Sequence, residues 1–182
     1  MNKIPSVNLD DFLSENQVLK QKFVAEIGHA YESIGFVALK GHFLEDDLVD
    51  SLYKEVKAFF DLPLSTKKQY EIPGIGGQRG YVSFGKESAK GRKEGDLKEF
   101  WHFGQFVENN PILEKEYHPN VEVKELENFN AVGKQTYRML EKTAKYVLRA
   151  LALYLDLEET YFDAFIHNGN SILRPIHYPP IT

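Results

Sequence analysis

The sequence contains no cysteine, which excludes disulfide bonds and thiolate-ligated metal sites within its 182 residues. It has no apolar run approaching the length of a membrane-spanning helix, and its first residues lack the apolar stretch of a signal peptide. Neither sign of charge is segregated, because acidic and basic residues are interleaved and the net charge is −5. We therefore expect a cytoplasmic protein that binds neither nucleic acid nor a membrane.

Several catalytic signatures are missing as well. There is no Gly-x-Ser-x-Gly elbow and no His-Glu-x-x-His pattern. An iron site built from two histidines and one carboxylate commonly takes two ligands from a His-x-Asp/Glu pair. None of the six histidines has an acidic residue two positions later; they are His29, His42, His102, His118, His167 and His177. Each is better interpreted as a packing or surface residue, so we predict no metal ligand and no catalytic residue in this chain.

The sequence is rich in aromatic residues, which make up 13% of it and include 13 Phe and 10 Tyr. Such a content indicates a well-filled core, a ligand cleft, or both. The length suits one compact unit spanning residues 1–182, without a visible linker.

Hydrophobic periodicity predicts both helices and strands. The first helix follows a capping-box pair, Ser14 and Gln17, and ends near residue 33 or 34, because Gly35 suits the position after a helix. Two further helices are expected at about 45–60 and 125–155, with one short turn at 66–70. Strands are expected at 4–9, 36–39, 99–103 and 171–178.

The segment from Pro73 to Gly80 is rich in glycine. It is not a dinucleotide-binding fingerprint, because Arg79 stands where a third glycine is needed, and no Lys-Ser/Thr pair of a P-loop follows. A turn-rich connector is therefore favoured over a phosphate-binding loop.

The last predicted strand carries the most suggestive side chains. Because side chains alternate along a strand, Arg174, Ile176 and Tyr178 should share one face. An Arg and a Tyr together can bind a carboxylate, the guanidinium through a charged fork and the phenol through one hydrogen bond. The alternative is an edge strand with a solvated Arg. This strand has no following partner in the sequence, so we expect a domain truncated at its C-terminal end.

Six segments together resemble the isopenicillin N synthase-like family of non-haem Fe(II) dioxygenases, most of which depend on 2-oxoglutarate. Each segment is weakly specific, but all six occur in the family's order and cover nearly the whole chain. They are Ile4–Leu9, Gly35–His42, Ala58–Tyr70, Arg79–Tyr81, Asp96–Glu99 and Tyr178–Pro180.

The resemblance implies an α+β fold: an N-terminal helical and mixed region running into the first strands of a double-stranded β-helix, or jelly roll, incomplete at the C-terminus. It implies that Tyr178 faces the active site and touches 2-oxoglutarate, and that Arg174 faces the same cavity. It places Arg79 and Tyr81 in a segment that closes over substrate, although the two could equally form only a turn.

The implied activity is oxidation of a small organic substrate by O2, with Fe(II) and 2-oxoglutarate as cofactors of the complete protein. The family's His-x-Asp pair and its later His and Arg-x-Ser motif are absent here, so we expect this chain to hold neither cofactor tightly. The alternative is a metal-free helical binding or interaction module without catalytic activity. The sequence indicates neither the substrate nor an oligomeric state.

Overall fold

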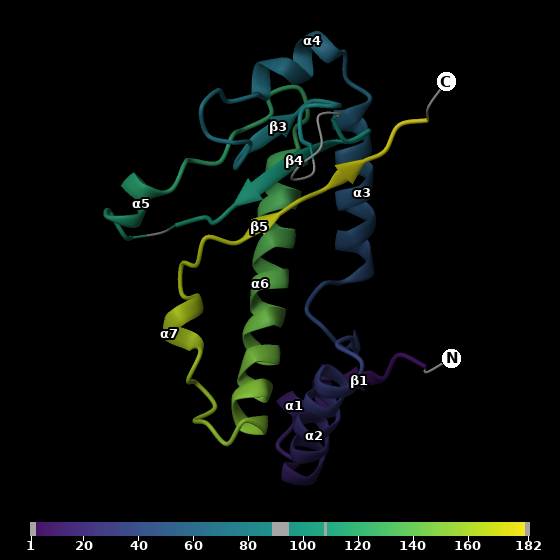
Figure 1. The fold of residues 1–182 in the computed structure, drawn as a ribbon, viewed down its shortest axis with the longest axis vertical. Helices are drawn as coiled ribbons and strands as arrows, with labels where there is room; N and C mark the ends of the chain where they lie inside the picture. The colour runs from purple at the N-terminus through teal and green to yellow at the C-terminus, as the bar shows by residue number, and fades with distance from the viewer. Residues whose placement is uncertain (1–2, 89–94, 108, 181–182) are drawn as a thin grey trace. The chain divides into compact units, whose positions relative to one another are not determined.

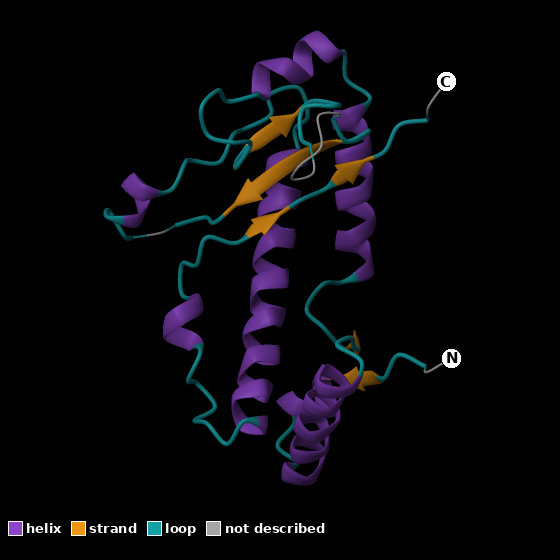
Figure 2. Ribbon diagram, viewed as in Figure 1, coloured by secondary structure: helices purple, strands orange, loops and turns teal. Residues whose placement is uncertain are grey.

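A computed structural model of the chain describes residues 3–88, 95–107 and 109–180 (Figure 1). It combines helices with short strands, which confirms the α+β class expected from the sequence (Figure 2). The chain forms two compact units: residues 1–45 with 138–167, called here the N-terminal unit, and residues 46–137 with 168–182, called the sheet unit. Part of the predicted polar loop at 86–98 lies outside the described residues.

The N-terminal unit is mainly helical. Its elements are β1 (Ser6–Asn8), α1 (Leu9–Leu13), α2 (Gln17–Ser33), β2 (Ala38–Lys40), the part of α6 (Phe129–Tyr154) from residue 138 onward, and α7 (Asp163–Ile166). β1 and β2 pair in parallel, with Val7 opposite Leu39. Buried Phe12, Phe23 and Ile27 fill the core of this unit.

The helix caps correct one expectation. Asn16, not Ser14, caps α2, because its side chain accepts hydrogen bonds from the backbone N–H groups of Val18 and Leu19. Ser14 instead follows the end of α1, a short helix that the sequence reasoning missed. Gly35 has a φ of 78° after α2, as the expected C-terminal position requires.

The sheet unit contains the remaining elements. They are α3 (Asp46–Phe60), α4 (Leu64–Lys67), the 3-10 helix η1 (Lys68–Tyr70), β3 (Gly80–Val82), β4 (Glu99–Gly104), α5 (Leu113–Glu116), the first turns of α6, β5 (Ile172–Leu173) and β6 (Ile176–His177). The expected strand at 171–178 is thus split into two short strands around Pro175. β3 is a strand where the sequence predicts only a turn.

β4 is the central strand of an antiparallel sheet. It pairs with β3 on one side and with both β5 and β6 on the other (Figure 1). Between β5 and β6, the Trp101 N–H donates to the Pro175 carbonyl at 3.1 Å, so the proline interrupts the strand without separating it from β4.

One face of β4 packs on helices. Trp101 is fully buried, with its ring centroid 4.8 Å from that of Phe59 in α3 and 5.1 Å from that of Phe129 in α6. Gly133 lets α6 approach closely, since a Cβ there would stand 2.2 Å from the Phe103 ring. The alternate residues of β4, Phe100 and His102, therefore point to the opposite face, called here the outer face.

No helix within the described part of the chain is both long enough and apolar enough to cross a bilayer.

Candidate functional site

Arg174 lies on the outer face of the sheet, against two residues of β4. Its guanidinium carbon is 4.5 Å from the centre of the Phe100 ring, a cation–π contact. Its Nε donates a hydrogen bond to Nε2 of His102. The guanidinium is therefore held on two sides, while the side chain as a whole stays 37% exposed.

The expected alternation along the last strand is confirmed. Ile176 pairs with Phe100, and exposure of the side chains alternates from residue 172 to residue 178. Tyr178 is 67% exposed and follows Arg174 by four residues, an even spacing in the alternation. His177 points to the helix side, where its ring stacks on that of Phe60 with the two ring centroids 5.1 Å apart. Arg174 thus lies on the outer face, and the exposed Tyr178, one residue beyond β6, continues the alternation; their role toward a ligand remains a prediction.

His102 is 3% exposed and lies among charged groups. Its pKa is lowered to about 4, mainly by burial and also by the neighbouring Arg174 and Arg79 guanidinium groups, against the opposing effects of the Gly77 carbonyl and Glu87. The imidazole is consequently neutral at pH 7.

Arg79 is 1% exposed and lies against the backbone of β4. It donates from Nη1 to the Gln78 carbonyl at 2.8 Å and from Nη2 to Asn170 Oδ1 at 3.1 Å. Gly104 makes room for it, since a Cβ there would stand 1.8 Å from the guanidinium carbon. Burial lowers the pKa of Arg79. Arg79 thus ties the glycine-rich segment to the residues before β5, and its contact with substrate remains a prediction.

Tyr81 belongs to a buried network on the helix side. Its hydroxyl donates to Glu99 Oε2, and Lys67 Nζ donates to the same carboxylate at 2.8 Å and to the Phe60 carbonyl at 2.8 Å. His177 Nδ1 lies 2.8 Å from Glu99 Oε1. The Tyr81 hydroxyl is therefore engaged with protein, and its role toward substrate also remains a prediction.

The network keeps Glu99 ionised although it is only 5% exposed. Burial alone would raise the pKa of Glu99, but hydrogen bonds from Lys67, Tyr81 and His177 outweigh it and leave the pKa below its ordinary value. The same burial, with the Glu99 carboxylate beside it, raises the pKa of Tyr81. Glu99 is thus an anion matched by the Lys67 cation.

A hollow of about 370 Å³ lies beside the glycine-rich segment. Its lining includes Gly77, Tyr81, Val82, Glu87 and Phe100. Val82 pairs with Phe100 across β3 and β4, so this hollow adjoins the outer face. The predicted connector is therefore a wall of a cavity.

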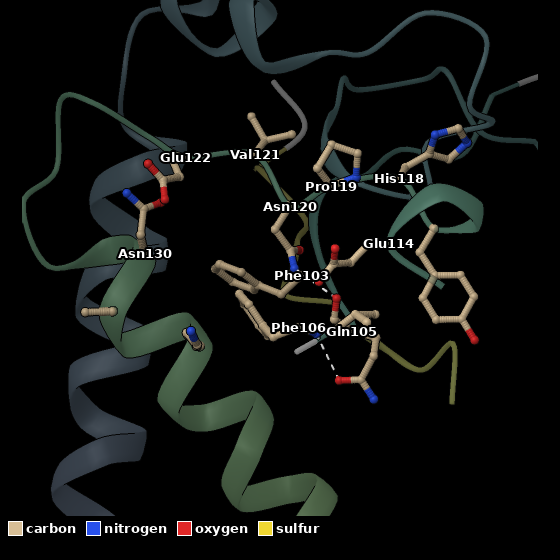
Figure 3. A pocket seen from close by; sticks show the side chains of 14 residues that line it. Phe103, Gln105, Phe106, Glu114, His118, Pro119, Asn120, Val121, Glu122 and Asn130 are labelled. Carbon is tan, nitrogen blue, oxygen red and sulfur yellow. Dashed lines mark hydrogen bonds between the residues drawn. The ribbon is translucent and has the colours of Figure 1, made fainter. Parts of the chain in front are cut away.

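A second hollow, of about 570 Å³, lies at the end of β4 (Figure 3). Phe103 and Phe106 occupy its middle, with Glu122 and Asn130 at one end and His118 at the other. Asn120 fixes the adjoining loop by bonding both backbone groups of Gly104. The lining of this second hollow combines acidic, basic and aromatic side chains.

Within residues 3–88, 95–107 and 109–180, no three His, Asp or Glu side chains are grouped so as to hold a metal ion. The described residues therefore do not fit an iron site, and no step of a reaction can be assigned to iron from them. A guanidinium and a phenol can each bind a carboxylate, and binding of one by Arg174 and Tyr178 remains a prediction.

Sequence reasoning missed the role of His102, which it classed, like the other histidines, as a packing or surface residue. One signal was present: in Glu99-Phe-Trp-His-Phe, His102 alternates with Trp101, whose ring is fully buried on the helix side, and so lies on the opposite face. Its partners Gly77 and Arg174 are 25 and 72 residues away, however, and no local pattern relates them.

Residues 4–125 match the family described as "non-haem dioxygenase in morphine synthesis N-terminal". The match covers more than half of the chain, which therefore belongs to this family. The resemblance inferred from the six segments is confirmed at the family level.

Among curated proteins, a 2-oxoglutarate-Fe(II) type oxidoreductase of Aspergillus fumigatus is 31% identical over 97% of this chain and 54% of its own length. Among solved structures, a protein of Caulobacter crescentus assigned to the 2OG-Fe(II) oxygenase family is 36% identical, with a TM-score of 0.86 over 100% of this chain and 58% of that one. A full-length protein of Neurospora crassa, solved in complex with alpha-KG, is 27% identical with a TM-score of 0.80, over 98% of this chain and 54% of that one. The chain spans about half the length of the relatives that it matches.

Replacing the buried carboxylate should destabilise the sheet unit strongly. Glu99→Gln leaves the Lys67 ammonium buried without an anion, and we expect a loss of about 3–5 kcal/mol in the free energy of unfolding at pH 7. Asp61→Asn is the matched control, because it removes an exposed Lys57 partner and should cost less than about 1 kcal/mol. Urea titration measures both; equal losses would contradict a structural role for the Glu99 network.

His102 should make stability depend on pH. Its pKa falls from 6.5 in the unfolded chain to about 4 in the folded protein, so its contribution is fully present above pH 6.5 and is lost as pH falls toward 4. We expect wild type to lose up to about 3 kcal/mol over this range relative to His102→Phe. Chemical denaturation at several pH values measures the difference; parallel curves for the two proteins would show that His102 titrates normally.

Proposed function

We propose that this chain is the N-terminal part of a non-haem Fe(II), 2-oxoglutarate-dependent dioxygenase that oxidises a small organic substrate with O2. The observation that carries the proposal is the outer face of the sheet, where Arg174 is fixed against Phe100 and His102; the exposed Tyr178 continues the alternation of the same strand. Membership of the dioxygenase family supports it, as does the likeness to the Neurospora crassa protein whose structure contains alpha-KG.

In this proposal, Arg174 and Tyr178 bind 2-oxoglutarate. The guanidinium supplies charged hydrogen-bond donors to a carboxylate, and the Tyr178 hydroxyl adds one neutral hydrogen bond. Arg79 and Tyr81 act in the segment beside the substrate, Tyr81 as a wall of the hollow of about 370 Å³. The Neurospora crassa protein has also been solved with thymine, which supports a small-molecule substrate here.

We further propose that β3 to β6 are the first strands of a jelly-roll core and that residues 1–182 act as one N-terminal region of that enzyme. The iron ligands then lie outside these residues. The sequence supports this through its six histidines, none of which has a carboxylate two positions later. Bound iron, where present, would supply the activation of O2.

Tyr178 and Arg174 should both contribute to 2-oxoglutarate binding. In the enzyme that contains this region, Tyr178→Phe should weaken the affinity about three- to tenfold and Arg174→Gln about tenfold or more, as expected for one neutral and one charged hydrogen bond. Isothermal titration calorimetry measures the dissociation constants. Tyr53→Phe, at a 73% exposed tyrosine in α3, is the control and should leave affinity unchanged. An unchanged affinity in Arg174→Gln would overturn the assignment.

The 182-residue chain alone should not couple 2-oxoglutarate decarboxylation to substrate oxidation. Because the proposal puts the iron ligands outside it, metal analysis after incubation with Fe(II) and gel filtration should find far less than one iron per chain. Succinate release should equal the no-protein background. Stoichiometric iron, or succinate release abolished by a chelator, would refute the placement of the ligands.

A further inference from the structure

The His102 imidazole bridges two segments that are distant in sequence. Its Nδ1 lies within hydrogen-bonding distance of the Gly77 carbonyl, and its Nε2 faces Nε of Arg174. A carbonyl oxygen only accepts hydrogen bonds, so Nδ1 must carry a proton. An arginine Nε only donates, so Nε2 must keep its lone pair. One species satisfies both partners: the neutral imidazole protonated on Nδ1.

The charges around the ring favour the same species. Arg174, between β5 and β6, and Arg79, before β3, are two cations that oppose a third positive charge on His102. Glu87, from the segment after β3, and the Gly77 carbonyl act in the other direction. Burial of the ring decides the balance against the imidazolium, so the bridge is intact at neutral pH.

The bridge restricts the directions in which Arg174 can donate. Nε is committed to His102 and the guanidinium lies over Phe100, which fixes both the plane and one edge of the group. The Arg174 side chain as a whole is 37% exposed. Nη1 forms an ion pair with Oε1 of Glu87 at 3.6 Å, so a ligand carboxylate at this end would share Nη1 with Glu87 or displace it.

We propose that His102 is a positioning residue: in its neutral form it holds the Arg174 guanidinium so that Nη1 and Nη2 present a preformed fork to the carboxylate of a ligand. This inference rests on the proposed function, because it assumes that Arg174 binds a carboxylate. A fork held in place loses less side-chain entropy on binding than a free Arg side chain does.

The bridge itself can be tested without any ligand. In the ¹⁵N-labelled 182-residue chain, the His102 ring should show the Nδ1-protonated tautomer from pH 8 down to about pH 5, and the Arg174 Nε–H should exchange slowly with water. His102→Phe keeps a ring beside Phe100 but has no acceptor, so the Arg174 Nε–H should exchange faster. An Nε2-protonated ring or an imidazolium at pH 7 in wild type would overturn the proposal.

Binding then tests the consequence, with 2-oxoglutarate as the probe. In the enzyme that contains this region, His102→Phe should weaken its affinity up to about tenfold, the size expected when ligand binding must immobilise an Arg side chain that is otherwise free. His102→Gln can place a carbonyl oxygen near Arg174 Nε and should restore affinity to within about threefold of wild type. His118→Phe, at an exposed histidine of the loop beside the 570 Å³ hollow, should change nothing.

These outcomes distinguish the positioning role of His102 from the proposed function. Normal affinity in His102→Phe, in a protein whose unfolding midpoint shows that it is folded, would overturn the positioning role and leave the proposed function standing. If wild type binds no 2-oxoglutarate, the proposed function fails. The exchange of the Arg174 Nε–H then decides the positioning role: slow exchange in wild type and fast exchange in His102→Phe support it, and equal exchange in both refutes it.

Discussion

A buried carboxylate at the start of the central strand is the constraint on which the sheet unit depends. Glu99 is ionised inside the protein, and such a charge is tolerated only where a cation and hydrogen-bond donors surround it. Lys67 from the end of α4, Tyr81 from β3 and His177 from β6 supply them. α4, β3 and β6 must therefore all meet at Glu99 before its carboxylate has its hydrogen-bond partners. This requirement favours the register in which His177 of β6 lies opposite Glu99 of β4.

The register of β6 has its effect on the other face of the sheet. With His177 directed to Glu99, strand alternation sends Ile176 and Tyr178 outward. The same rule applies to β4, where Trp101 is held among the rings of Phe59 and Phe129, so that His102 faces outward. The helix-side packing thus determines what the outer face presents. In the proposed function, the groups that bind the ligand are therefore positioned by side chains buried on the opposite face of the sheet.

Local patterns predicted the elements that local physics determines. The apolar spacing of the long helix at 125–155 and of the helix at 45–60 matched α6 and α3 within a few residues, and the alternation of Arg174 and Tyr178 was correct. β3 was missed because three residues after a glycine turn carry no readable alternation. The role of His102 was missed because its hydrogen-bond partners lie far from it in the sequence. The expected dioxygenase chemistry came from resemblance to a family and not from residue spacing.

The glycine-rich segment takes part in the same arrangement as the Arg174 site. Gly77 has a φ of 71°, a conformation that other residues rarely adopt, and its carbonyl accepts the His102 hydrogen bond. From Gly77 the chain of contacts runs through His102 to Arg174, while the segment also lines the hollow of about 370 Å³. A shift of this segment would move the acceptor of His102 and so release the edge of the guanidinium. The wall of the hollow and the direction of the Arg174 fork are therefore parts of one hydrogen-bonded unit.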